Sequence, residues 1–152
     1  QLRGKEVLVS CCGIAWGGLS FWNLNDYTQL CIVKESGVSW ATHMIELSDG
    51  NIALSSGDEP YPIVIIDSST FQVKKQIQLV GWYSSLCVFD EHSFIYVYKG
   101  TFLQISNEDG SVLCHSEGGN FDGYRGILPL EGGKYFAIDD GNRITIIKPC
   151  FV

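Results

Sequence analysis

Several features that mark large classes of protein are scarce in this chain. Helical periodicity is nearly absent and no run of about 20 apolar residues occurs, so we expect neither a helical fold nor a helix across a membrane. Positive charge is scarce too, because 10 Lys and Arg stand against 17 Asp and Glu, and Lys74-Lys75 is the densest basic spot. A phosphate backbone requires clustered Lys and Arg, so we expect no nucleic-acid partner.

Sequence motifs of common enzymes and metal sites are missing. The chain has no Gly-x-Ser-x-Gly elbow, no phosphate-binding glycine loop and no calcium loop. Its three histidines, His43, His92 and His115, lack metal-binding spacing. The acidic pairs stand at turn signals, where Asp and Glu are common, and they are Asp58-Glu59, Glu108-Asp109 and Asp139-Asp140. The sequence therefore predicts that the protein is not an enzyme and has no cofactor and no metal.

Cysteine is present, but its placement argues against disulfide bonds. Of the six cysteines, Cys31, Cys87 and Cys114 lie in strand-like apolar runs, and no CxxC spacing occurs, so we expect free buried thiols. Without a signal-peptide pattern or an Asn-x-Ser/Thr acceptor, the sequence predicts a cytoplasmic protein. The first residue is Gln1 instead of Met, so a fragment, a processed product and the ordered part of a longer chain are open alternatives.

What the chain does contain suits many short strands. It has 17 glycines, 12% aromatic residues and 45% apolar residues, which predicts a folded core and tight turns. Trp40, Trp82 and Tyr124 follow one another at a constant interval of 42 residues, each just ahead of an apolar segment that ends in a turn. A period of about 40 to 45 residues built from short strands is typical of the blades of a β-propeller.

Four types of strand-like segment, named a to d, recur in a fixed order. Type a, with its turn, occupies residues 44–50, 86–92 and 127–133, and type b occupies 6–11, 51–56, 93–98 and 134–138. Type c occupies 19–23, 63–67, 102–106 and 144–148, and type d occupies 29–33, 73–77 and 111–115. The order bcd, abcd, abcd, abc predicts an all-β fold of four antiparallel blades, some incomplete, within one array. We place the blades at about 1–38, 39–80, 81–122 and 123–152.

The ends of the type c segments resemble those of a known family. The resemblance is to the WD40-type β-propellers, which have Trp-Asp at this place, and the matching residues are Trp22-Asn23, Ile66-Asp67, Ile105-Ser106 and Ile147-Lys148. Residues 46–56 are similar to the a–b hairpin of that family. The repeats are degenerate. The resemblance implies a rigid, disc-like platform whose loops around the central channel bind partners.

The expected function is that of a non-catalytic scaffold for protein–protein interaction. Trp, Tyr and Arg often anchor protein interfaces. In a WD40-like blade the residues that enter type a lie in channel-side loops, and here these residues are Trp40, Trp82, Tyr124 and Arg125. Trp16 and Tyr61, in the b–c loops, extend the same surface. Packing of these aromatic side chains between blades is the alternative interpretation.

Two further functions stay open at this point. The first blade lacks type a and the last lacks type d, and exposed strand edges invite pairing. The chain is therefore an alternative assembly module, whose open ends pair into a full propeller or a larger complex, including self-association through blade edges. A ligand-binding or hydrolytic propeller is the second alternative, and it requires polar groups that converge on the channel, together with a metal.

Overall fold

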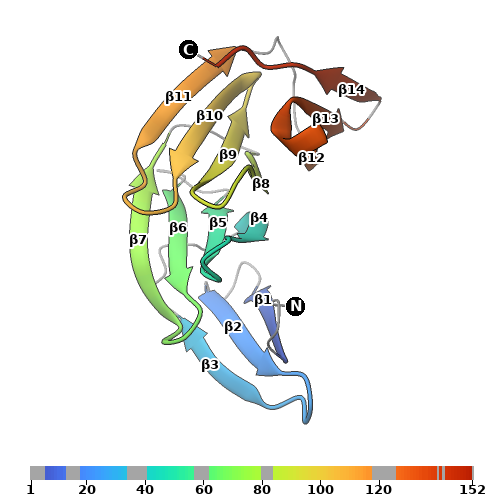
Figure 1. The fold of residues 1–152 in the computed structure, drawn as a ribbon. Helices are drawn as coiled ribbons and strands as arrows, with labels where there is room; N and C mark the ends of the chain where they lie inside the picture. The colour runs from blue at the N-terminus through green and yellow to red at the C-terminus, as the bar shows by residue number, and fades with distance from the viewer. Residues whose placement is uncertain are drawn as a thin grey trace. The chain divides into compact units, whose positions relative to one another are not determined.

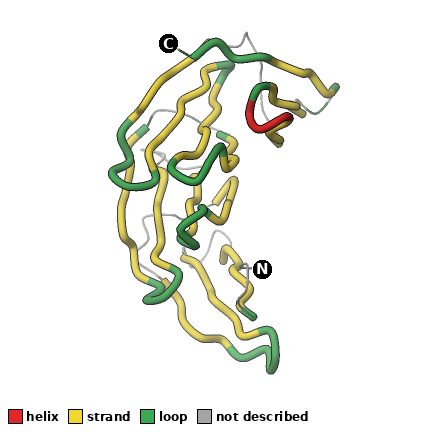
Figure 2. Tube along the Cα trace, viewed as in Figure 1, coloured by secondary structure: helices red, strands yellow, loops and turns green. Residues whose placement is uncertain are grey.

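The computed structural model describes residues 6–12, 18–33, 41–56, 62–79, 84–117, 126–139, 141 and 143–151. These residues form fourteen β-strands and one single-turn 3-10 helix, η1, which is the only helical element among them (Figures 1 and 2). The chain divides into two compact units, Gln1–Val80 and Gly81–Val152. Each unit contains two antiparallel sheets, and the two units are described separately.

The first unit contains a three-stranded and a four-stranded sheet, each with its strands in chain order (Figure 1). The first sheet is formed by β1 (Val7–Cys12), β2 (Gly18–Asn23) and β3 (Gln29–Val33). The second is formed by β4 (Ala41–Glu46), β5 (Ile52–Ser56), β6 (Pro62–Asp67) and β7 (Gln72–Gln78). Within each of these two sheets, consecutive strands therefore pair as hairpins.

One apolar core joins the two sheets of the first unit. Leu19 and Phe21 alternate along β2, so they lie on the same face, and both are fully buried. They belong to one cluster with the second sheet's Ile52, Leu54, Val64 and Ile66. The ring of Phe71, which precedes β7, lies 4.4 Å from that of Phe21. The two sheets thus pack face to face.

The second unit repeats this plan with the sheet sizes reversed. Its four-stranded sheet is formed by β8 (Ser85–Val88), β9 (Ser93–Tyr98), β10 (Thr101–Ser106) and β11 (Val112–Glu117). Its three-stranded sheet is formed by β12 (Gly126–Leu130), β13 (Tyr135–Asp139) and β14 (Ile144–Ile147), with η1 (Glu131–Gly133) between β12 and β13. The core between them contains Phe102 and Phe136, whose ring centroids are 5.7 Å apart.

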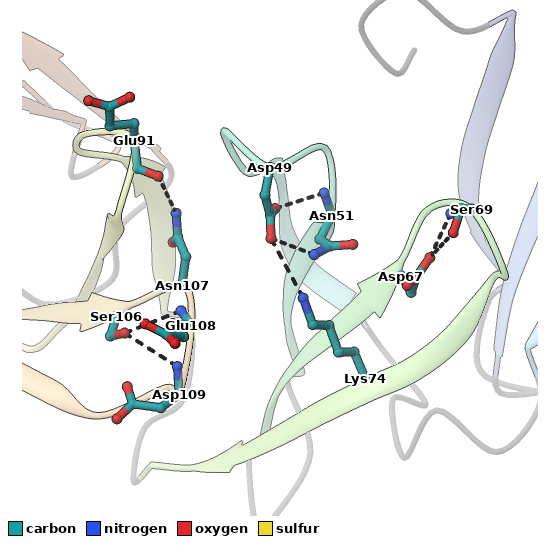
Figure 3. Close-up of polar contacts among 10 residues, drawn as sticks. All are labelled: Asp49, Asn51, Asp67, Ser69, Lys74, Glu91, Ser106, Asn107, Glu108 and Asp109. Carbon is teal, nitrogen blue, oxygen red and sulfur yellow. Dashed lines mark hydrogen bonds and ion pairs between the residues drawn. The ribbon is translucent and has the colours of Figure 1, made fainter.

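The turns that follow β2, β6 and β10 share one construction. Asn23, Asp67 and Ser106 end these strands, and the side-chain oxygen of each accepts a backbone N–H from two residues further on, at 2.8, 2.8 and 3.2 Å respectively (the last two in Figure 3). Four residues after each of them the backbone has a positive φ, at Tyr27, Phe71 and Gly110. The strand pairs that these turns connect, β2–β3, β6–β7 and β10–β11, each have a β-bulge at the same repeat position. The bulges fall at Phe21/Trp22, Ile65/Ile66 and Gln104/Ile105. Asx-turns, or an ST-turn at Ser106, together with these bulges therefore set the register of β3, β7 and β11.

The prediction of an all-β fold made of four antiparallel sheets of three or four strands is confirmed. The prediction of free cysteines is confirmed for the four whose side chains the structure describes, Cys31, Cys87, Cys114 and Cys150. Of the three that were expected to be buried, Cys87 is buried, whereas Cys31 and Cys114 are half-buried. Burial raises the pKa of the Cys87 thiol to about 12, so this thiol stays protonated and serves as a small core residue.

Candidate functional site

The residues predicted to contact a partner all fall outside the described part of the chain, and they are Trp16, Trp40, Tyr61, Trp82, Tyr124 and Arg125. Their places along the chain are nevertheless informative. Trp40 directly precedes β4, Trp82 stands shortly before β8, and Tyr124 and Arg125 precede β12. In the sequence, these four residues thus stand between the last strand of one sheet and the first strand of the next. Their role stays a prediction.

An exposed apolar surface lies on one face of the sheet β12–β14. Leu128, Ala137 and Ile146 are directly opposite one another across the three strands, and Ile144 is next but one to Ile146 along β14. The other face holds Ile138, which is buried in the core of the unit. Leu128 is 60% exposed, Ile144 73% and Ile146 56%. We call the surface formed by Leu128, Ala137, Ile144 and Ile146 the β12–β14 face.

The repeat shows that the β12–β14 face is unusual. Bulge positions and turn residues align Ile144 with Leu19, Ile63 and Phe102, which are each 0% exposed. Leu19 is covered by the adjacent sheet of its unit, and so is Phe102. Only Ile144 of these four is open to solvent. Its side chain is thus of the type that the other sheets bury.

The second face of sheet β1–β3 differs in chemistry. It combines the exposed Leu8 and Ile32 with polar side chains that are already hydrogen-bonded. Trp22 Nε1 donates to Ser10 Oγ at 3.1 Å. Gln29 Nε2 donates to Ser20 Oγ, also at 3.1 Å. Because a hydroxyl placed against an apolar partner must keep such a bond, this face is less suited than the β12–β14 face to apolar contact.

An open groove of about 540 Å³ lies in the first unit, between β3 and the beginning of β7. Its lining consists of Cys31, Ile32, Val33, Thr70, Phe71, Gln72 and Val73. The nucleophile among these residues is Cys31, and burial raises the pKa of its thiol. Among the described lining residues, none is an acid or a base that would activate this thiol.

Other groups with catalytic or metal-binding chemistry do not converge in the described part of the chain. Within it, no group of three or more His, Cys, Asp or Glu side chains could hold a metal ion. His92 and His115 are exposed, the former in a turn and the latter on β11. Glu108 and Asp109 lie exposed in the turn before β11, as predicted for a solvated acidic pair (Figure 3). Among the described residues, no helix has the length and apolar character needed to span a membrane.

Sequence reasoning did not single out Leu128, Ile144 or Ile146. The signal available was the run Ile144-Thr145-Ile146-Ile147, which differs from Ile63-Val64-Ile65-Ile66 at one position. The second run is followed by Asp67 and a further strand, whereas the first is followed by Lys148 and Pro149. The residue that follows each run, Asp67 or Lys148, was therefore the difference visible in the sequence.

Comparison with known proteins gives the fold and little else. No family model matches the chain. No curated protein matches it either. Among solved structures 205 chains match, including one titled Kuenenia stuttgartiensis hydrazine synthase, with a TM-score of 0.69 and 12% sequence identity. The match covers 89% of this chain and 43% of that chain, so this chain spans less than half of the matched one. At such low identity the likeness shows a shared all-β fold.

This comparison corrects one prediction. The expectation that the chain is not an enzyme is wrong, because it rested partly on the kind of fold, and that fold occurs in a chain of an enzyme, hydrazine synthase. A fold does not decide whether a protein is catalytic, since function depends on the sites built on it. The shared fold equally assigns no hydrazine chemistry to this chain.

Proposed function

We propose that this chain is a protein-binding module built from the blades of a WD40-like β-propeller. The observation that supports it best is the β12–β14 face, where Ile144 is 73% exposed at a repeat position that is buried in the other three sheets. Contiguous exposed apolar side chains on a folded protein mark sites of interaction. The fold supports the propeller arrangement, because consecutive sheets pack face to face within each unit.

Burial of the β12–β14 face contributes substantially to a binding free energy. Complete burial of a Leu or Ile side chain contributes roughly 1.5–3 kcal/mol. Leu128, Ile144 and Ile146 are each more than half exposed, so their burial together contributes roughly 3–6 kcal/mol. A micromolar complex has a binding free energy of about −8 kcal/mol. The face therefore supplies a large part of such an affinity.

The channel-side loops are the second proposed contact surface. The sequence places Trp40, Trp82 and Tyr124 at one repeat position, each ahead of the first strand of a sheet. Aromatic side chains at the centre of an interface are frequent hot spots. We assign partner contact to these loops, with Arg125, Trp16 and Tyr61 beside them.

We also propose a cytoplasmic location. It is supported by the unpaired thiols of Cys31, Cys87, Cys114 and Cys150, since reduced cysteines are the rule in the cytosol. Alkylation of intact cells before lysis, followed by denaturation and mass mapping, checks this proposal. Disulfide-linked peptides from these four positions would contradict it.

Site-specific cross-linking tests the proposed function. A photoreactive amino acid replaces Leu128 in one variant and Val112 in a control, because Val112 is also exposed, at 47%, but lies on β11. We expect a partner that cross-links from position 128 and not from 112. That partner is then purified and titrated against Ile144→Lys and Val112→Lys, and we expect about a tenfold or greater loss of affinity for the first variant alone. Equal cross-linking from both positions, or equal affinity of both variants, would refute the proposal.

The mass of the purified chain in solution separates a foreign partner from self-association. If the chain forms dimers that Ile144→Lys dissociates and Val112→Lys does not, then the partner at the β12–β14 face is a second copy. A monomer at the concentrations used for cross-linking assigns the face to another protein.

A further inference from the structure

In the described part of the chain no strand pairs with the outer edge of β14, whereas the corresponding edges of three other strands are covered. β2, β6 and β10 each pair on their outer side with a further strand, which is β3, β7 and β11 respectively. β14 is the last strand of its sheet among the residues that the structure describes. Figure 1 shows β6 and β10 each between two strands, and β14 at the end of its sheet. None of the described strands takes up the backbone N–H and C=O groups of this edge, and a row of such groups is a template for pairing with a further strand.

The residues that directly follow β14 do not form the turn that leads to an outer strand in the other three sheets. Asn23, Asp67 and Ser106 start the turns that lead to β3, β7 and β11 by accepting backbone N–H groups. Lys148 holds the same repeat position, and an ammonium group accepts no hydrogen bond. The turn thus lacks its acceptor, and the residue two further on, whose N–H such a turn uses, is Cys150.

The chain instead continues across the second unit. The backbone N–H of Cys150 donates to Ser116 Oγ on β11 at 2.9 Å. The ring of Phe151 then packs on Phe89, with 5.9 Å between centroids, and joins the core. Cys150 and Phe151 are therefore committed to other contacts.

The strand that would fit this edge can be specified from β6 and β7. β6 contains Ile63-Val64-Ile65-Ile66 and β14 contains Ile144-Thr145-Ile146-Ile147, so the two differ only at Val64 and Thr145. On β6, the partner β7 places Ile77 opposite Ile63, Gln76 opposite Val64 and Lys75 opposite Ile65. After the bulge, Val73 lies opposite Ile66. A strand of this pattern on β14 would place an apolar residue opposite Ile144 and another opposite Ile147.

We propose that the outer edge of β14 binds an extended segment of another polypeptide as an added antiparallel strand of the β7 pattern. Such strand addition uses main-chain hydrogen bonds for affinity and alternate side chains for specificity. The proposal deepens the proposed function, because the added strand would continue the sheet that carries the β12–β14 face. It adds a backbone-mediated site to a side-chain-mediated one, and the two can be tested apart.

A synthetic peptide with the sequence of residues 72–79 is the probe, titrated by fluorescence anisotropy against the full chain. Successive N–H groups of a strand point to opposite edges, so two N-methylated versions, one at each set of alternate residues, separate the edges. We expect one version to bind roughly tenfold more weakly, since it loses several hydrogen bonds, and the other to bind within about twofold of the parent. Equal binding of the parent and both versions would overturn the proposal, as would no binding of the parent.

The position of the peptide is a second, independent measurement that leaves the protein unaltered. With a spin label on the peptide, we expect broadening of the backbone NMR signals of Ile144–Ile147 and none at Gln29–Val33, an edge strand of the first unit. Broadening at β3 instead would overturn the assignment to β14. If the peptide does not broaden the signals of β14 but Ile144→Lys still weakens binding of the partner, the strand-addition site is refuted and the proposed function stays intact. Peptide binding at β14 with no effect of Ile144→Lys on the partner refutes the proposed function and supports this site.

Discussion

The turn between β12 and β13 provides a sharp test of how the second unit is packed. Gly133 is buried and has a φ of +87°, and the ring of Phe89 lies directly against its Cα. A Cβ at position 133 would lie closer than 3.0 Å to Cε2 and Cδ2 of that ring, a separation that real Cβ atoms essentially never show. Gly133→Ala therefore forces the ring of Phe89 or the turn to move.

Two costs add in this variant. A left-handed backbone costs a residue with a Cβ about 1–2 kcal/mol. Overpacking of a core costs typically a further 1–3 kcal/mol, and here Phe89 has little room, because it also contacts Phe136 and Phe151. We expect Gly133→Ala to lower the free energy of unfolding by roughly 2–5 kcal/mol.

Two neighbouring glycines are matched controls. Gly132 has a φ of +66° but nothing within 4 Å of an added Cβ, so Gly132→Ala is expected to cost only the backbone part, about 1–2 kcal/mol. Gly126 has no positive φ and no atom within 4 Å, so Gly126→Ala is expected to change stability by less than about 0.5 kcal/mol. Urea unfolding followed by far-UV circular dichroism measures all three. Equal losses for Gly133→Ala and Gly132→Ala would refute the packing of Phe89 on this turn.

Three further predictions concern other parts of the chain. Trp82→Ala is expected to weaken partner capture while far-UV circular dichroism stays unchanged, and unaltered affinity for the purified partner would remove the loops from the interface. Hydrogen bonds from Ser69 and Thr70 lower the pKa of Asp67 to about 2, so the turn keeps this stabilisation above pH 4 and loses it as pH falls towards 2. NMR titration of the Asp67 carboxyl group is expected to give a midpoint near 2 that rises in Ser69→Ala. An unchanged midpoint in that variant would contradict the assigned cause. Alkylation of the native protein near pH 8 is expected to modify the exposed Cys150 and spare the buried Cys87, whose pKa is raised to about 12, and mass mapping that finds Cys87 modified first would contradict its burial.

The part of the fold that could be predicted from the sequence is the part that local physical chemistry determines. Apolar runs such as Ile63–Ile66 form strands because β-branched side chains pack well on a pleated sheet. Short polar turns separate them, as at Asp49, whose carboxylate accepts the N–H of Asn51 at 3.0 Å (Figure 3). Gly50 supplies the positive φ of +81° in the same turn. Strand order and sheet membership follow from such local signals, because each sheet is a series of hairpins.

Exposure of individual strands could not be predicted in the same way. The runs that begin at Ile63 and Ile144 are nearly identical in sequence, yet every residue of the first is buried, whereas Ile144 and Ile146 of the second are 73% and 56% exposed. Burial depends on what a sheet packs against, which is a non-local property. The identity of the turn-starting residue, Asp67 or Lys148, was the local difference that correlates with it. The expectation about catalysis failed for a related reason, since a fold leaves the chemistry of its loops undetermined.

The recurrence of turn and bulge in three sheets also limits what can bind at β14. In each of these sheets the turn residue and the bulge two residues before it form a unit that fixes where the outer strand begins. A strand added to β14 from another polypeptide would arrive without that turn, so only its side-chain pattern could set the register. A shift by one residue would exchange the faces of all its side chains. Because Ile144 and Ile146 lie on one face and Ile147 on the other, a shifted strand would lose apolar contacts on both.

The edge should therefore discriminate between segments by pattern, and a β7-type peptide with two adjacent residues exchanged, Ile77 and Gln76, is expected to bind more weakly than its parent. Equal binding of the two peptides would show that backbone pairing alone determines the affinity.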